Sequence, residues 1–319
     1  RAGMKGYAYT IFAGEQVEKF DLQVVGVLDN FLGPGQAIIL VQLLGPKVEH
    51  TGVVAGMSGS PVYLEGKLAG ALSLKLGIFT KEAIAGVTPI EDVLGRKPAA
   101  PRAAAPQPLP AELAARNSLP TGAALEPIAT PLVFSGFQPS TIQQFAPQIE
   151  SYGFVAAQGG TEPQRTGDSA LHPGEMAGMV LVQGDANISS ACTVTAIQAG
   201  RVTLCGHPFL NLGDVQFPMS RSRVVMTLAS DLASTKIVNV GGPIGTIPSD
   251  HLTAVTGKLG PPPPMIPLDF TLVSGATEKN LHFELVNPPK LSPLLVAITT
   301  FSGLTQNAFY GEGTTLHLQ

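Results

Sequence analysis

The first 95 residues consist of short apolar segments separated by turn residues. Six such segments occur, at 6–12, 17–28, 37–43, 61–64, 69–76 and 83–87. Glu65-Gly66-Lys67 separates the fourth from the fifth, and an Xaa-Gly pair in that position is typical of a β-hairpin. Thr88-Pro89 then supplies a helix N-cap and a proline at the first helical position. Segments of this number and length predict one small β-barrel followed by a short helix.

The composition agrees with a mainly β chain. Only 13% of the residues are charged, whereas about 25% is usual. The 36 glycines and 28 prolines indicate many turns, which favours an all-β architecture. The net charge of −4 provides no basic footprint for nucleic acid, so we expect no nucleic-acid partner.

Composition and pattern divide the rest of the chain. Residues 96–127 are rich in alanine and proline, which predicts an extended linker. Residues 128–176 read as an α/β insert and loop, with strands near 128–137 and 154–157 around a helix at 140–151. A second β-barrel is expected over 177–260, from apolar segments at 178–184, 189–198, 201–206, 220–229, 236–240, 243–248 and 252–256. Residues 261–319 form a C-terminal β/α extension, with strands at 266–273 and 281–286, a helix at 292–303 and a final short strand.

The turn before the fourth apolar segment reads Gly56-Met57-Ser58-Gly59-Ser60-Pro61. A serine hydroxyl becomes a useful nucleophile when a base takes its proton, and the intermediate needs donors for its negative charge. Glycine at 56 lets the backbone turn so that the N–H groups of Gly56 and Ser58 can form an oxyanion hole. We therefore take Ser58 as the candidate nucleophile, because Ser60 lies one residue past the second glycine. The alternative is a Gly/Ser-rich turn without chemistry.

The candidate base lies in the second predicted barrel. His207 follows a strand in Leu204-Cys205-Gly206-His207-Pro208, and a histidine at a strand end can reach across a cleft between barrels. The alternative is a histidine that only terminates its strand. The other five histidines are weaker candidates: His50, His172, His251, His282 and His317. His282 alternates with apolar neighbours and should face solvent.

These motifs resemble a known family. GMSGSP, the hairpin GKLAGAL and the closing GVTPIEDVL are similar to the stage IV sporulation protein B serine peptidase family of the chymotrypsin-like superfamily. GHPF and residues 241–257 resemble that family's histidine segment and the stretch after it. The resemblance covers roughly 1–95 and 175–260 and implies an extracytoplasmic serine peptidase with Ser58 as nucleophile and His207 as base.

The order of the two halves differs from the family's, because here the serine half precedes the histidine half. A catalytic triad is defined by position in space, so a circular permutation of the two barrels would preserve it. The expected fold is therefore mainly β, with two six-stranded chymotrypsin-like barrels in permuted order, a small α/β insert and a C-terminal β/α tail. The family's PDZ-like module is not recognisable.

The third member of a triad has two candidates. In chymotrypsin-like barrels the orienting aspartate lies near the end of the histidine barrel, which corresponds to Asp250 in Pro248-Ser249-Asp250. Asp231 is the second candidate. Either aspartate could instead cap a turn, and a Ser–His dyad without an acid is a further alternative.

Cys192 and Cys205 are the only cysteines and lie on adjacent predicted strands. In register they would be close enough for a disulfide in an oxidising compartment. The alternative is a pair of buried thiols. Their spacing is unlike that of a zinc site, and no phosphate-binding or dinucleotide motif occurs. We expect no metal and no cofactor.

The leading interpretation is a serine endopeptidase acting on a protein or peptide, with Ser58 forming an acyl-enzyme and His207 as general base. A third interpretation is a self-cleaving module that cuts its own chain once, within 96–127 or 158–176. The alternative is a catalytically silent double-barrel scaffold that binds a peptide or a cell-envelope protein.

Overall fold

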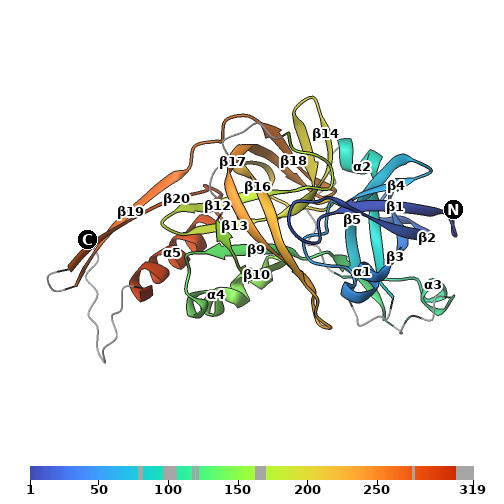
Figure 1. Ribbon diagram of the computed structural model, residues 1–319, viewed down its shortest axis with the longest axis horizontal. Helices are drawn as coiled ribbons and strands as arrows, with labels where there is room; N and C mark the ends of the chain where they lie inside the picture. The colour runs from blue at the N-terminus through green and yellow to red at the C-terminus, as the bar shows by residue number, and fades with distance from the viewer. Residues whose placement is uncertain are drawn as a thin grey trace.

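The computed structural model of the chain describes residues 1–77, 82–95, 106–116, 119, 122–161, 170–274 and 277–306. Strands dominate it, and two strand-rich halves lie side by side (Figure 1). The mainly β class expected from the sequence is confirmed. No helix in the described ranges is both long and apolar enough to cross a membrane.

The first half is a closed barrel of six antiparallel strands. They are β1 (Lys5–Thr10), β2 (Glu18–Gly33), β3 (Gln36–Leu44), β4 (Pro61–Leu64), β5 (Lys67–Leu76) and β6 (Ile84–Pro89). Neighbours follow the order β4-β1-β2-β3-β6-β5, and β5 pairs back with β4 to close the barrel. Two short helices accompany it, α1 (Pro46–Thr51) and α2 (Ile90–Gly95). The β-barrel predicted for this part of the sequence is confirmed.

The hairpin between β4 and β5 shows why the sequence folds this way. Glu65 and Gly66 form its two-residue turn with φ values of 50° and 75°, which match the twist of the flanking strands. Inside the barrel, alternate residues of the strands are buried together, among them Leu22, Val24 and Leu72. The serine turn thus leads directly into a strand that is anchored in this core.

The second half contains a ring of six antiparallel strands. They are β12 (Met176–Gly184), β14 (Cys192–Gln198), β15 (Arg201–Leu204), β16 (Gly213–Leu228), β17 (Thr235–His251) and β18 (Ala254–Leu259). Pairing runs β12-β14-β15-β18-β17-β16 and returns to β12. The segments 236–240 and 243–248, expected as separate strands, form the single strand β17. Gly241 and Gly242 do not end it, because extra residues of β17 are accommodated by register shifts opposite Met219–Ser222 of β16.

The expected insert has the predicted strand–helix–strand order. It comprises β9 (Thr130–Ser135), α4 (Pro139–Ser151) and β10 (Phe154–Gln158), and the two strands are parallel. The insert is not a separate body, because β9 pairs with β13 (Asn187–Ser190), which in turn pairs with β12. The short strand β11 (Gly160–Thr161) pairs with β17.

The C-terminal extension follows the prediction as far as it is described. A hairpin of β19 (Ile266–Ser274) and β20 (Thr277–Leu285) projects from the body, and α5 (Ser292–Gln306) follows it (Figure 1). β20 joins the sheet through β12. The final short strand that we expected lies outside the described residues.

Residues 96–127 differ from the extended linker that we expected. Their described part contains β7 (Gln107–Pro108), α3 (Ala111–Arg116) and β8 (Ala124–Pro127). β8 pairs with β5 of the first barrel. Leu125 is the only large apolar residue of β8 and is buried, and one apolar residue gives no periodicity for sequence analysis to find.

Candidate functional site

The serine turn lies between α1 and β4 and is held by its own backbone. The N–H of Met57 donates to the carbonyl of Val54, and the N–H of Ser60 donates to Met57. Gly56 and Gly59 have φ values of 94° and 91°, a left-handed conformation that glycine adopts without strain. The turn therefore requires glycine at both positions.

The two serines of the turn differ in their partners. The hydroxyl of Ser60 donates to the carbonyl of Met57 at 2.7 Å. Ser58 is fully buried, and its Oγ has no hydrogen-bond partner among the described residues. A buried hydroxyl without a partner is unusual and calls for an explanation. Of the two hydroxyls, only that of Ser58 is therefore unbonded.

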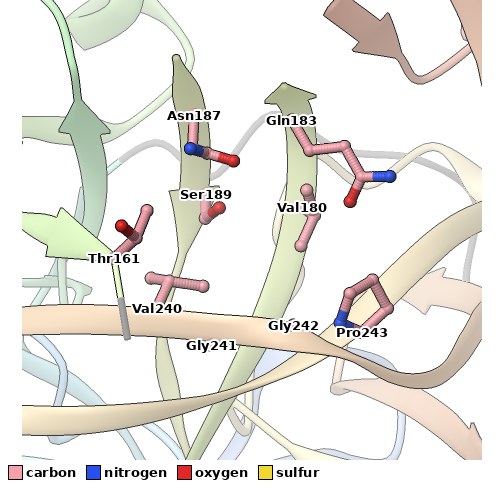
Figure 2. A pocket seen from close by; sticks show the side chains of 9 residues that line it. All are labelled: Thr161, Val180, Gln183, Asn187, Ser189, Val240, Gly241, Gly242 and Pro243. Carbon is pink, nitrogen blue, oxygen red and sulfur yellow. The ribbon is translucent and has the colours of Figure 1, made fainter. Parts of the chain in front are cut away.

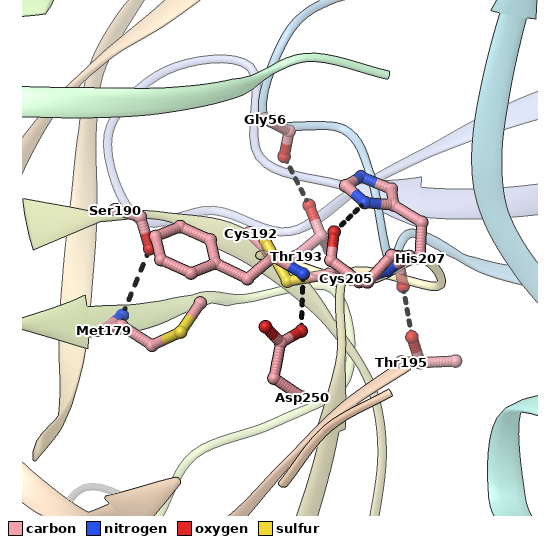
Figure 3. Close-up of a disulfide and its surroundings, with 12 residues drawn as sticks. Gly56, Met179, Ser190, Cys192, Thr193, Thr195, Cys205, His207 and Asp250 are labelled. Carbon is pink, nitrogen blue, oxygen red and sulfur yellow. Dashed lines mark hydrogen bonds between the residues drawn. A yellow bond between two sulfur atoms is a disulfide. The ribbon is translucent and has the colours of Figure 1, made fainter. Parts of the chain in front are cut away.

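The turn packs against β14 of the second half. A Cβ added to Gly59 would lie 2.0 Å from the carbonyl oxygen of Thr193, so the approach is too close for any side chain. The N–H of Thr193 donates to the carbonyl of Ser58 at 2.8 Å. The hydroxyls of Thr193 and Thr195 donate to Gly56 and Gly59 at 2.9 Å and 2.7 Å (Figure 3). One strand of the second half therefore fixes the serine turn.

The histidine approaches from the same strand pair. His207 follows β15 through Cys205 and Gly206, whose φ values are 70° and 68°. The N–H of Cys205 donates to the carbonyl of Thr193 at 3.3 Å, and the hydroxyl of Thr88 in the first barrel donates to the carbonyl of Gly206 at 2.9 Å. The backbones that carry Ser58 and His207 are thus bonded to the same threonine, Thr193.

The imidazole of His207 is buried and is suited to the role of a base. Nδ1 lies 2.7 Å from the carbonyl oxygen of Pro208 (Figure 3), which assigns the proton to Nδ1 and leaves Nε2 as the acceptor. Nε2 has no hydrogen-bond partner among the described residues, and so it is not bonded to Ser58 Oγ. Burial lowers the pKa of His207, and the carbonyls of Pro208 and Ile128 act in the opposite direction. The ring is therefore neutral at neutral pH.

Asp250 supports the loop that follows the histidine. Its carboxylate accepts the N–H groups of Phe209, Leu210 and Leu212 at 2.6, 2.7 and 3.3 Å. Figure 3 shows one of these bonds to Asp250. Burial raises the pKa of Asp250, and these backbone donors lower it. No hydrogen bond joins Asp250 to the ring of His207, both of which are described. Asp250 thus positions the histidine loop through its backbone.

Asp231, the second aspartate considered, lies elsewhere. It is exposed, in the turn between β16 and β17. In that turn the hydroxyl of Ser234 accepts the N–H of Ser230 and lies near the carbonyl of Thr51, at the end of α1. Asp231 belongs to the tip of a hairpin, and no contact described there connects it with His207.

The two expected oxyanion donors are not equally available. The N–H of Gly56 donates to the carbonyl of Ala129 at 3.2 Å. Each backbone N–H is a single donor, so an oxyanion at Gly56 would have to replace this carbonyl. The site contains the expected turn, but one of its donors is occupied by the chain itself.

Cys192 and Cys205 form a disulfide between β14 and the histidine turn (Figure 3). Cys192 precedes Thr193, which binds the serine turn, and Cys205 lies two residues before His207. The disulfide therefore holds together the two backbone segments on which the candidate site depends.

Lys236 is a buried group near the serine turn that the sequence analysis did not single out. It is fully buried, and Nζ donates to the hydroxyl of Thr10 at 2.7 Å. Its stem lies 3.3 Å from the position of a Cβ on Gly56. Burial lowers the pKa of Lys236 to about 7. An alternating segment with one lysine, Lys236-Ile-Val-Asn-Val, normally indicates that the lysine faces solvent. The sequence pattern would therefore have predicted an exposed side chain, and the burial of Lys236 could not be found from it.

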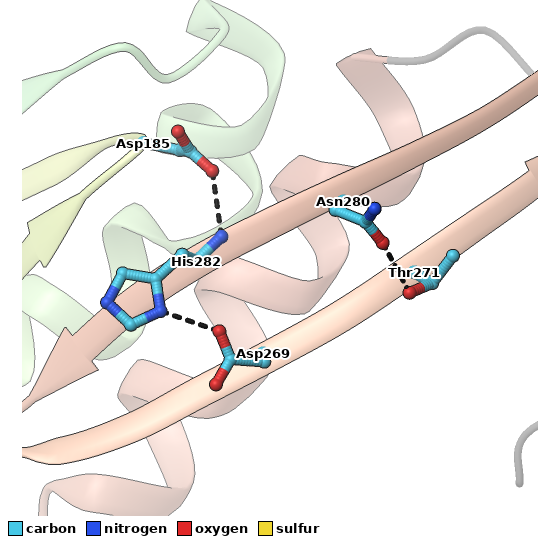
Figure 4. Close-up of polar contacts among 5 residues, drawn as sticks. All are labelled: Asp185, Asp269, Thr271, Asn280 and His282. Atoms are coloured by element: carbon cyan, nitrogen blue, oxygen red, sulfur yellow. Dashed lines mark hydrogen bonds and ion pairs between the residues drawn. The ribbon is translucent and has the colours of Figure 1, made fainter.

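Of the other described histidines, His50 is exposed in the last turn of α1, and three have acidic partners at the surface. His282 is exposed, as expected, and its Nδ1 lies 2.6 Å from a carboxylate oxygen of Asp269 (Figure 4). That hydrogen bond raises the pKa of His282. His172 and His251 lie beside Glu175 and Asp214, and His317 is outside the described residues.

A separate cavity of about 260 Å³ lies between β12, β13 and β17. Gln183, Asn187 and Ser189 face it, and the backbone of Gly241 forms part of its wall (Figure 2). None of the residues that line it belongs to the serine or histidine turns, so it is not part of the candidate site.

Comparisons with known proteins find no relative: no family model, no curated protein and no solved structure matches the chain.

Proposed function

We propose that this chain is a serine endopeptidase in which Ser58 is the nucleophile and His207 the general base. The observation that carries the proposal is the shared contact on Thr193. Its N–H binds the carbonyl of Ser58, and its carbonyl binds the N–H of Cys205, two residues before His207. Two turns that are far apart in the sequence are thereby bonded through their backbones to one residue. One turn carries an unbonded hydroxyl and the other a neutral imidazole, which supports the proposal.

In the proposed reaction, Ser58 Oγ attacks the carbonyl carbon of a peptide bond and its proton passes to Nε2 of His207. The bond between Nδ1 and the carbonyl of Pro208 supports this role, because it leaves Nε2 as the proton acceptor. His207 then gives the proton to the leaving amine, and water hydrolyses the acyl-enzyme. Asp250 fixes the loop that carries the base.

The proposal extends to the fold and the setting of the protein. The two rings of strands would be chymotrypsin-like barrels in permuted order, as the resemblance to the sporulation protein B family implies. A disulfide is typical of extracytoplasmic proteins, which favours a secreted, periplasmic or cell-envelope location with a protein or peptide substrate. Self-processing belongs to the same proposal, and comparing intact masses of the wild type and Ser58→Ala would detect it.

Covalent labelling with a fluorophosphonate tests the enzyme proposal. We expect an adduct on Ser58 that is lost in Ser58→Ala and retained in Ser60→Ala. The hydroxyl of Ser60 is already hydrogen-bonded, whereas that of Ser58 is not. His207→Gln should slow labelling by about 10²–10⁴-fold, the usual contribution of a general base. An adduct on Ser60, or none on any folded variant that retains Ser58, would contradict the proposal.

A second candidate is a silent scaffold that binds a peptide or a cell-envelope partner. The occupied N–H of Gly56 favours it, as does the carboxylate of Asp250, which is used by the backbone. The labelling experiment separates the two, because a scaffold would form no adduct while remaining folded by circular dichroism.

A further inference from the structure

The segment between β8 and β9 runs from the sheet edge of the first barrel onto the serine turn. β8 pairs antiparallel with residues 74–76 at the end of β5. Beyond β8, the N–H of Ile128 donates to the carbonyl of Ser73 at 2.9 Å, and the carbonyl of Ala129 accepts the N–H of Gly56 at 3.2 Å. Backbone hydrogen bonds therefore continue without a break from β5 to the serine turn.

β5 is itself attached to the serine turn. The N–H of Gly59 donates to the carbonyl of Leu72 at 2.7 Å, and the pairing with the segment begins at the next residue, Ser73. Peptides commonly bind proteins by adding a strand to a sheet edge, with main-chain hydrogen bonds supplying affinity. Residues 124–129 have this arrangement. The carbonyl of Ala129 accepts the N–H of Gly56, which is one of the two expected oxyanion donors.

The same segment also reaches the histidine. Ile128 is fully buried, and its carbonyl favours the protonated form of His207, thereby opposing the fall in the pKa of that ring. The segment thus bonds the serine turn through the carbonyl of Ala129, and the carbonyl of Ile128 acts on the pKa of the base. A substrate carbonyl at Gly56 would need the position that Ala129 now holds.

Two apolar side chains and one ion pair hold the segment in place. Leu125 and Ile128 are 1% and 0% exposed. Glu126 lies 3.2 Å from Lys75 of β5, and both side chains are partly exposed. The segment is therefore bound through groups of its own as well as through its backbone.

We propose that residues 124–129 are an inhibitory segment that fills the peptide-binding groove of the Ser58 site. This inference rests on the proposed function, because it takes Ser58 as the nucleophile. It identifies the substrate as an extended peptide that adds antiparallel to the end of β5. Productive binding then requires the segment to withdraw from β5 and from Gly56.

Loosening the segment should expose the nucleophile. Ile128→Ala removes its main anchor, and Ile188→Ala is the matched control, because Ile188 is also fully buried but lies in β13 in the core of the second half. We expect a fluorophosphonate to label Ser58 about tenfold faster, or more, in Ile128→Ala than in the wild type. A tenfold change needs only a modest loss of segment stability. Ile188→Ala should label at the wild-type rate.

A second variant leaves the core intact, in case the first does not fold. Glu126→Lys places two lysines side by side on the groove, and labelling should rise by about two- to fivefold, as for an ion pair at a partly exposed position. Glu18→Lys is the control, because Glu18 pairs with Lys47 away from the segment.

The outcomes separate the two proposals. Rapid labelling of Ser58 in the wild type, unchanged in both segment variants, would overturn the inhibitory segment and leave the peptidase proposal standing. Equal acceleration in Ile188→Ala would also overturn it, because general loosening would then explain the effect. Failure to label any folded variant would overturn the peptidase proposal and this inference with it.

Discussion

Replacing Lys236 by methionine should stabilise the protein in a pH-dependent manner. The lysine is fully buried, and burial lowers its pKa from 10.5 to about 7. At about 1.4 kcal/mol for each pKa unit, this corresponds to about 5 kcal/mol of unfavourable free energy below pH 7. Methionine has a similar length and no charge. The substitution removes the hydrogen bond to the Thr10 hydroxyl, which lowers the free energy of unfolding by about 1 kcal/mol.

The sign of the pH dependence follows from proton binding. Between pH 7 and 10.5 the unfolded chain holds a proton on Lys236 that the folded protein does not. The free energy of unfolding of the wild type therefore rises with pH in this window by up to about 1.4 kcal/mol for each pH unit. The Lys236→Met variant lacks this contribution. We expect it to be more stable than the wild type by about 4 kcal/mol at pH 6 and by about 1 kcal/mol at pH 9.

Urea unfolding at the two pH values measures the difference. Circular dichroism is the suitable probe, because the chain has no tryptophan. Lys67→Met, at an exposed position in the β4–β5 hairpin, is the control and should change stability by less than about 0.5 kcal/mol at either pH. A Lys236→Met protein that is less stable than the wild type at pH 6, or whose advantage does not shrink at pH 9, would refute the reasoning.

Three further predictions concern the site. Gly59→Ala should destabilise the protein by about 2–5 kcal/mol in urea unfolding, from steric overlap with β14 and a strained backbone, whereas Gly66→Ala, whose Cβ would meet nothing within 4 Å, should cost only about 1–2 kcal/mol; equal losses would contradict this. As the pH is lowered, the rate of fluorophosphonate labelling should fall with a midpoint below pH 6.5, because protonated His207 cannot act as a base and burial lowers its pKa from that ordinary value. A midpoint at or above pH 6.5 would show that the base is not buried. Reducing the bond between Cys192 and Cys205 should lower the free energy of unfolding by about 3 kcal/mol and slow labelling, and labelling that is unaffected by reduction would show that the disulfide does not organise the site.

Much of the first barrel was predictable because its turns carry local signals. Glu65-Gly66 gave the hairpin between β4 and β5, and Thr88-Pro89 gave the start of the helix that closes the unit. The helix of the insert was likewise predictable, because Ile142 and Ile149 belong to a 3.6-residue apolar pattern between two apolar segments. Features that depend on neighbours in sequence were accessible without coordinates.

The features that were missed depend on distant parts of the chain. β8 contributes one buried leucine to a strand whose partner is in the first barrel, so its sequence resembles that of a linker. Asp250 could be identified as a candidate, but its bonds to the backbone of Phe209 and Leu210 follow from how β17 meets the histidine loop. The burial of Lys236 depends on its contacts with the serine turn and β1, and no local pattern in the sequence indicates it.

The contact of the serine turn with Thr193 affects how the protein is made. The ribosome completes the first barrel, including Ser58, well before β14 and the histidine turn exist. The turn cannot acquire its threonine partners until that later strand has been synthesised and folded. The final conformation of the serine turn therefore depends on a strand whose Thr193 is synthesised 137 residues after Gly56.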